Sequence, residues 1–241
     1  MKNLLILFAF VFYLPILNSH TLEKAISSDD RETKNILRDS YRNPYETLSF
    51  FEIKSDMKIV ELSPGGGWYT EILANYIDKP GLLIAAHFDK DTNIPYFKRG
   101  RAAFEKKINT NPMYKNVEIV DLSSELAKEG SIDAVLTFRN LHNWLGPQMD
   151  NIFSNTYKAL KPGGIFGVVE HRANPGTSME KMKKSGYVTE EHAIKVAEKH
   201  GFTLVSKSEI NANPKDTKDY PRGVWTCLLY TSDAADEGLG V

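Results

Sequence analysis

The residues best suited to chemistry form a short glycine-rich turn after an apolar run. The run covers residues 58–62, and Ser63-Pro64-Gly65-Gly66-Gly67 follows it directly. Glycines in such a turn let the backbone approach a ligand, and the N-terminus of a following helix attracts anionic groups. Glu61 stands near the end of the run, at the edge where open α/β sheets bind ligands. We therefore predict a ligand site at this turn; a tight turn that binds nothing is the alternative.

The glycine spacing argues against two common nucleotide sites. A dinucleotide-binding turn needs glycine at its first, third and sixth positions, and the sixth residue is Trp68 counted from Ser63 or Thr70 counted from Gly65. The small sixth residue that allows close helix–strand packing is therefore missing in both registers. No Gly-Lys-Ser/Thr follows, which disfavours a triphosphate loop. An NAD-type oxidoreductase is the least favoured enzyme class.

Two other polar groups follow later apolar runs. The first contains Asn140, His142, Asn143 and Trp144, and the second contains Glu170, His171 and Arg172. His142 is a candidate general base because imidazole titrates near neutral pH, and a histidine bonded to loop backbone is the alternative. Glu170 and His171 are candidates for the same crevice, either binding an anionic substrate or forming a charged rim. The spacing of His87, His142 and His171 is not typical of a metal site, and we predict none.

These residues need a scaffold, and the hydrophobic pattern supplies one. Short apolar runs alternate with amphipathic segments, which predicts a doubly wound, mostly parallel α/β sheet. Several runs are apolar on both faces, as strands covered by helices on both sides must be. The predicted strands are 58–62, 82–86, 117–120, 132–138, 165–170 and 202–206.

The segments between the strands carry helix signals. A helix with one buried stripe is predicted over 149–160, and Lys-Pro-Gly-Gly at 161–164 stops it. Another helix is predicted over 68–77. The last begins after Thr189, because acidic residues fill its first turn while a basic residue and a glycine mark its end. Residues 21–43 are polar and predicted to be helical in part.

Composition sets the wider limits. The chain has 241 residues with 30 Lys+Arg against 31 Asp+Glu, so its net charge is −1. This balance argues against nucleic acid as a partner, since phosphate binding needs a surplus of basic residues on one face. The one cysteine, Cys227, cannot form an internal disulfide. We expect one globular domain.

The N-terminus resembles a secretory signal. Lys2 precedes an apolar run over 4–17, which is shorter than the roughly 20 residues that a spanning helix needs. We expect export, to the periplasm, with a membrane tether at the N-terminus as the alternative. The predicted divisions are a signal peptide (1–20), a helical segment (21–56), the main domain (57–226) and an atypical tail (227–241).

The order of these motifs resembles the class I S-adenosylmethionine-dependent methyltransferases over about residues 58–206. Glu61, Ser63, Gly65 and Gly67 match the family's first motif, an acidic residue followed by alternating glycines. Residues 160–164 resemble the turn before the family's fifth strand. Residues 64–70, 138–144 and 209–216 more narrowly resemble a group of predicted bacterial methyltransferases that are often exported.

The resemblance implies a Rossmann-like methyltransferase fold with S-adenosylmethionine as cofactor. Its implied binding residues are Glu61, Ser63, Gly65, Gly66, Gly67, Asp89, Asp121 and Asn140, with Asp121 on the adenine side. The chain departs from the family in three places. Ser63 replaces the first motif glycine, and His87 stands where the ribose-binding acid is usual, so that Asp89 or His87 takes this role. A final antiparallel strand over 224–231 is the third uncertain feature.

Methyl transfer needs mainly the positioning of a nucleophile against an activated methyl group, so no fixed catalytic triad is expected. The sequence leaves the catalytic residues unassigned, with His142, Glu170 and His171 as candidates. The predicted function is methyl transfer to a small-molecule acceptor that the sequence does not identify. The alternative is an exported, non-catalytic binding module of the same fold for a nucleoside-like ligand.

Overall fold

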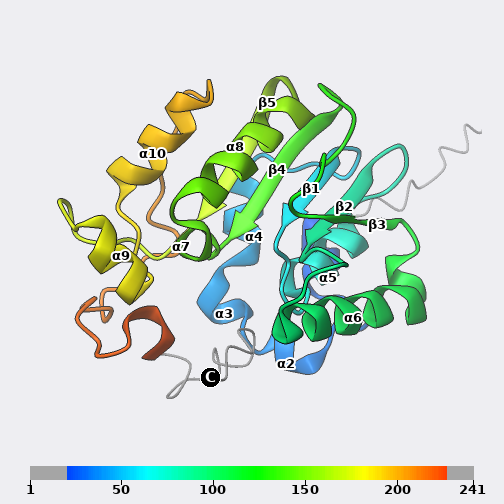
Figure 1. The fold of residues 1–241 in the computed structure, drawn as a ribbon. Helices are drawn as coiled ribbons and strands as arrows, with labels where there is room; N and C mark the ends of the chain where they lie inside the picture. The colour runs from blue at the N-terminus through cyan, green and yellow to red at the C-terminus, as the bar shows by residue number, and fades with distance from the viewer. Residues whose placement is uncertain (1–20, 227–241) are drawn as a thin grey trace, which may run out of the picture.

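The computed structural model describes residues 21–226 (Figure 1). The predicted signal peptide and the atypical tail, with Cys227, lie outside the described residues. No helix within 21–226 combines the length and the apolar character needed to span a bilayer.

A five-stranded, wholly parallel sheet forms the centre of the fold, with strand order β3-β2-β1-β4-β5. This arrangement confirms the predicted α/β class. The strands are β1 (Lys58–Leu62), β2 (Leu82–His87), β3 (Val117–Asp121), β4 (Ile132–Phe138) and β5 (Leu160–Val169).

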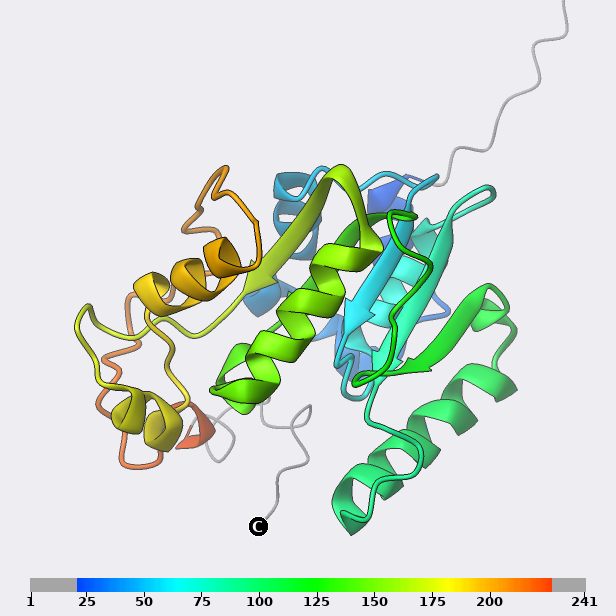
Figure 2. The ribbon, with the colours of Figure 1, turned by 45° about the horizontal axis from the view of Figure 1, so that its top comes forward.

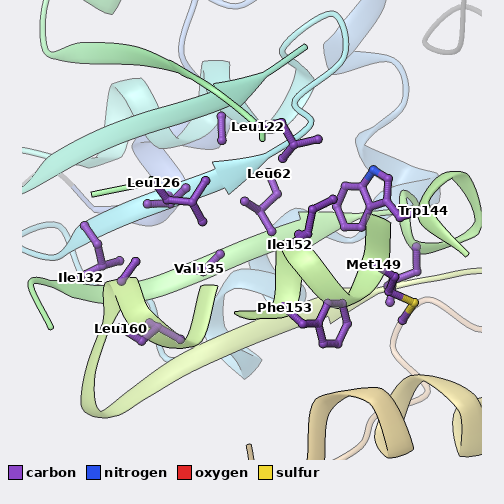
Figure 3. Packing of buried hydrophobic residues seen from close by; sticks show 14 of the residues in the cluster. Leu62, Leu122, Leu126, Ile132, Val135, Trp144, Met149, Ile152, Phe153 and Leu160 are labelled. Atoms are coloured by element: carbon purple, nitrogen blue, oxygen red, sulfur yellow. The ribbon is translucent and has the colours of Figure 1, made fainter. Parts of the chain in front are cut away.

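Helices cover both faces of the sheet (Figures 1 and 2). On one face, α7 (Leu141–Trp144) and α8 (Pro147–Ala159) pack against Val60, Leu62 and Val135. Figure 3 shows this cluster, in which Phe153 and Trp144 lie among the aliphatic side chains. The other face carries α5 (Trp68–Tyr76) and α6 (Pro95–Thr110), which is followed by the short η1 (Pro112–Tyr114). Burial on both faces explains why several strands carry apolar residues on both sides of the sheet.

The predicted helix ends are confirmed. Helix α10 (Glu190–Lys199) begins after Thr189, whose hydroxyl accepts a hydrogen bond from the His192 N–H. Helix α8 ends at Ala159, just before residues 161–164. Residues 161–164 form a bulge within β5. Before the bulge Leu160 pairs with Ile132 of β4, and after it Ile165 pairs with Ala134.

The N-terminal segment folds over α5 as four short helices. These are α1 (Leu22–Ile26), α2 (Thr33–Ile36), α3 (Asp39–Arg42) and α4 (Pro44–Phe50). The buried residues of this segment include three arginines, namely Arg31, Arg38 and Arg42, while Leu37 and Tyr41 are exposed. The guanidinium groups of Arg31 and Arg42 lie over the Trp68 indole, at 5.4 and 4.9 Å from its ring centre. Cation–π contacts thus add to the apolar contacts that Leu22 and Leu48 of this segment make in the core.

The prediction of a strand over 202–206 is wrong. These residues have no regular secondary structure, and the side chains of Leu204 and Val205 are exposed. Within residues 21–226, β5 is the edge strand on this side of the sheet and pairs with β4, and residues 202–206 do not add to its open edge. The described part of the predicted final strand is also not extended, because residues 223–226 form the 3-10 turn η2 (Gly223–Thr226), which packs against α9 (Met179–Ser185).

The core cluster predicts a specific stability effect. Phe153 is 1% exposed and contacts Phe166 and Phe202 edge-on. Replacing it by alanine leaves a cavity, so we expect Phe153→Ala to lower the free energy of unfolding by about 3–5 kcal/mol. Urea unfolding measures this value, and Lys158→Ala on the exposed side of the same helix is the control. Equal stability of both variants would contradict the assigned packing of α8.

Candidate functional site

The strand order changes direction between β1 and β4, which is where open α/β sheets form their binding crevice. The glycine turn (residues 63–67) leaves β1 at this point, and Asn140 lies just beyond β4. The Asn140 amide nitrogen is 3.3 Å from the Leu62 carbonyl oxygen and 3.2 Å from that of Ser63. Asn140 therefore joins the two sides of the switch point.

The glycine turn has an unusual backbone. Ser63, Gly65 and Gly67 have φ values of 50°, 58° and 87°, in the left-handed region that glycine adopts most easily. A Cβ atom on Gly67 would also lie 3.2 Å from the Phe104 ring of α6. Gly65 and Gly66 are exposed, so the backbone of the turn is accessible from outside. Ser63 occupies this strained conformation without being glycine, and such strain is common at ligand sites.

Side chains from three parts of the chain hold three carbonyl groups of the turn. Asn140 donates to Ser63 O, His87 Nε2 lies 3.2 Å from Gly65 O, and Lys107 Nζ donates to Gly66 O at 2.9 Å. These residues come from the ends of β4 and β2 and from α6. The turn is therefore fixed from several directions before any ligand binds.

Glu61 is buried under the turn, where its carboxylate accepts a 2.6 Å hydrogen bond from the Thr70 hydroxyl. Thr70 lies in the first turn of α5. The Glu61 carboxylate thus ties the end of β1 to the start of the helix. Helix α5 has no side-chain cap at Gly67, so its N-terminal dipole is not neutralised by a capping side chain.

His87 holds the turn as a neutral imidazole. Its Nδ1 accepts a hydrogen bond from the Phe88 N–H at 2.8 Å, which places the proton on Nε2, facing Gly65 O. Burial lowers the pKa of His87 to about 4, and the hydrogen bond to Gly65 opposes this shift only in part. The ring also stacks on Phe104 at 4.7 Å. His87 therefore holds the Gly65 carbonyl group from the buried side of the turn.

Asp89 and Asp121 lie together at the ends of β2 and β3. The Ser123 N–H donates to Asp89 Oδ1, and the Lys90 N–H donates to Asp121 Oδ1. Arg101 of α6 also binds Asp121 Oδ1 at 2.6 Å. Within residues 21–226, the hydrogen bonds of both carboxylates use Oδ1, which leaves the Oδ2 atoms to accept from hydroxyl groups.

The catalytic candidates His142 and Glu170 form a buried pair. Glu170 accepts hydrogen bonds from the backbone N–H groups of His142 and His171, and His142 Nδ1 lies 3.0 Å from its carboxylate. Burial opposes ionisation of Glu170, yet the charge and hydrogen bond of His142 outweigh it and lower its pKa. Burial lowers the pKa of His171 to about 4. Trp144, expected beside these residues, packs in the core instead.

The three histidines considered for a metal site do not share one. His87 lies under the glycine turn, whereas His142 and His171 lie beside β5, with ring centres 6.0 Å apart. Across residues 21–226, no three His, Cys, Asp or Glu side chains gather so as to hold a metal ion.

Several residues of the site were not predicted from the sequence. Thr70, Lys107 and Arg139 are among them; Thr70 and Lys107 contact the turn, and Arg139 follows β4 with a φ of 62°. Lys107 also pairs with Glu71 of α5 at 2.8 Å. The sequence around Lys107 does not indicate its contact with the turn, because its partners Gly66 and Glu71 are distant in the sequence.

Comparison with known proteins supports the fold. No protein-family model matches the sequence, and no curated protein matches it significantly. A methyltransferase from Aquifex aeolicus that depends on S-adenosylmethionine matches with a TM-score of 0.56 at 16% identity, covering 77% of this chain and 90% of that chain. The chain therefore has a Rossmann-like methyltransferase fold.

Two further structures share this fold. The cyclase SpnF matches with a TM-score of 0.57 at 15% identity, covering 77% of this chain and 70% of that chain. A putative sarcosine dimethylglycine methyltransferase from Galdieria sulphuraria matches with a TM-score of 0.53 at 12% identity, over 72% and 63% of the two chains. At such identities the likeness concerns the fold alone, and function must be argued from the site.

The buried state of His87 predicts a pH effect on stability. Its folded pKa of about 4 lies below the ordinary value near 6.5, so the unfolded chain binds the proton first and stability falls as pH drops from about 6.5 toward 4. Between pH 7.5 and 5 we expect His87→Gln to lose about 2 kcal/mol less unfolding free energy than the wild type. Urea unfolding at both pH values tests this. Identical losses would mean that His87 does not titrate as a buried base.

Proposed function

We propose that this protein transfers a methyl group from S-adenosylmethionine to a small-molecule acceptor. The observation that carries the proposal is the glycine turn at the switch point, fixed by Asn140, His87 and Lys107. An exposed glycine backbone beside an uncapped helix N-terminus suits the charged amino-acid end of this cofactor. The fold shared with methyltransferases supports the same assignment.

The side chains around the turn fit the rest of the cofactor. Asp89 and Asp121 lie at the neighbouring strand ends, where their Oδ2 atoms would accept from ribose or adenine donors. Because His87 is committed to the turn, we assign ribose binding to Asp89 rather than to His87. Glu61 would act indirectly, by fixing the turn through Thr70. S-adenosylmethionine supplies a methyl group already activated by its sulfonium charge.

The chain's own part in the reaction is then mainly positioning. Asn140 and the glycine turn hold the cofactor side of the crevice, and the ends of β4 and β5 carry the acceptor side. Where the acceptor must lose a proton, His142 in its neutral form is the candidate base. Glu170 fixes the orientation of its ring through Nδ1. His171 is neutral at physiological pH and would act as a hydrogen-bonding group.

A small acceptor agrees with the neighbouring structures, since one of them is named a geranyl diphosphate methyltransferase in complex with the cofactor (TM-score 0.53, 9% identity). The second candidate function is a non-catalytic module that binds a nucleoside-like ligand. Because one neighbour of this fold is named a cyclase, the fold does not by itself imply methyl transfer. A ligand-binding measurement therefore distinguishes the methyltransferase from the binding module.

Isothermal titration with S-adenosylhomocysteine tests the proposal. We expect the wild type to bind it, and Glu61→Ala and Gly65→Val to bind at least about tenfold more weakly, a difference of about 1.4 kcal/mol. Gly65→Val strains a left-handed position, and Glu61→Ala releases Thr70. Glu118→Gln on the exposed side of β3 is the control, and circular dichroism verifies folding.

Two outcomes would overturn this assignment. If neither the cofactor nor S-adenosylhomocysteine gives heat while another nucleoside does, the protein is a binding module. If both variants keep wild-type affinity, the glycine turn is not the site.

We also propose that the chain is exported, on the basis of Lys2 and the apolar run over 4–17. Residues 1–25 fused to a reporter that is active only outside the cytoplasm should give signal. A fusion with two of the apolar residues, Leu5 and Phe8, changed to arginine is the control and should be silent. A silent wild-type fusion would contradict export.

A further inference from the structure

Basic residues gather in the part of the chain that contains α6. Residues 92–117 hold six of the 30 basic residues of the chain but only one of its 31 acidic residues. The net charge of the whole chain is −1, so the rest of the chain is acidic overall. Helix α6 is therefore a positively charged element of a protein that is otherwise slightly acidic.

Two of these six cations have partners within the fold. Arg101 binds Asp121 at 2.6 Å and Glu105 at 2.8 Å. Lys107 is bound to the glycine turn and to α5. Glu105 is the one carboxylate of this segment, and it is already paired with Arg101. It therefore does not compensate the charge on the outer side of the helix.

The other four cations are exposed and form a basic face, which consists of Lys98, Arg99, Lys106 and Lys115. Within residues 21–226, their side chains take part in no ion pair and no hydrogen bond. The exposed Ala102 is three or four residues from each cation of α6, which places these residues on one side of the helix. The basic face is therefore continuous along α6, and no carboxylate neutralises it.

This face lies on the outside of the molecule. Figure 2 shows α6 at the periphery of the fold. The buried residues of the helix, Arg101, Phe104 and Ile108, are on the side opposite to the cations. A broad surface can therefore approach the basic face directly.

The start of α6 adds an exposed aliphatic group to this face. Ile94, the N-cap residue of the helix, is 50% exposed. The aromatic rings nearby contact one another instead: Phe97 stacks on Phe88 at 4.4 Å, and Tyr96 meets both rings edge-on. Ile94 is therefore the apolar side chain that is open to a partner at this end of the basic face.

We propose that the basic face binds the surface of a membrane that contains anionic lipids. The negative potential of such a surface attracts clustered Lys and Arg side chains, and an apolar group beside them, here Ile94, enters the interface. A nucleic acid fits this face less well, because its bases stack on exposed aromatic rings, whereas the rings at the start of α6 stack on one another. The proposal does not depend on methyl transfer, because the residues of α6 that hold the glycine turn are not part of the basic face.

Sedimentation of the full chain with lipid vesicles tests the proposal. One vesicle consists of phosphatidylcholine alone, and in the other about one quarter of it is replaced by phosphatidylglycerol. We expect binding to the anionic vesicle to be at least about tenfold stronger in about 0.1 M salt, and this difference to disappear in about 1 M salt, where charges are screened within about 3 Å. Apolar insertion of the run over 4–17 does not depend on lipid charge, so the difference between the two vesicles is the measured quantity.

Removal of the charges of the basic face should abolish this preference. We expect binding to the anionic vesicle to fall at least about tenfold in the triple variant Lys98→Gln/Arg99→Gln/Lys106→Gln. The control removes the same number of charges from exposed positions outside α6, in Lys54→Gln/Lys128→Gln/Lys158→Gln, and should bind like the wild type. Circular dichroism verifies that both triple variants fold.

Ile94→Asp is a second variant that preserves the helix. Aspartate is a favoured N-cap residue, so α6 keeps its start at Pro95. The aliphatic contact is lost, however, and a negative charge is added beside the basic face. Binding to the anionic vesicle should therefore fall at least about threefold.

Three outcomes would overturn the membrane proposal. The first is wild-type binding that does not distinguish the two vesicles. The second is equal binding of the wild type and the basic-face triple variant to the anionic vesicle. The third comes from the fluorescence anisotropy of a labelled single-stranded oligonucleotide: if the triple variant loses oligonucleotide binding while its vesicle binding is unchanged, the basic face is a nucleic-acid site.

Discussion

The immobilised backbone of the glycine turn is the constraint on which the rest of the site depends. The carbonyl groups of Ser63, Gly65 and Gly66 are held by Asn140 just beyond β4, by His87 of β2 and by Lys107 of α6. Glu61 binds the following helix through Thr70. A glycine backbone is otherwise flexible, and ordering it on binding would lower affinity. The packing of three elements around one turn removes that cost in advance.

Helix α5 connects the glycine turn to the N-terminal segment through hydrogen bonds and an ion pair. Glu71 is bound by Lys107, which also holds the turn, and by the Asn35 amide at 2.7 Å. Trp68 donates to the Asn35 carbonyl, and two buried arginines lie over its indole. The polar segment before β1 is therefore part of the support of the site. Removing one partner from such a network would leave buried charge uncompensated.

Sequence reasoning succeeded where a pattern is local. Three features depend on neighbouring residues alone, and the structure confirms them. They are the apolar runs of the five strands of the sheet, the start of the last helix after Thr189 and the break after Ala159. It failed for 202–206, whose apolar residues resemble a strand, because pairing needs a partner elsewhere in the chain. Helix α6 was not predicted either. Its buried stripe consists of Arg101, Phe104 and Ile108, and Arg101 gives no apolar signal.

By itself, the amino-acid sequence determined the α/β class, the glycine turn after the first strand and the strand ends that carry Asp121, Asn140 and Glu170. Only the tertiary structure decided what these groups do. It turned His87 toward Gly65, bound Asp121 to Arg101, and paired His142 with Glu170. The physical reason is that periodicity and capping act within one or two turns of chain. Hydrogen bonds and burial between distant segments depend on how the layers pack.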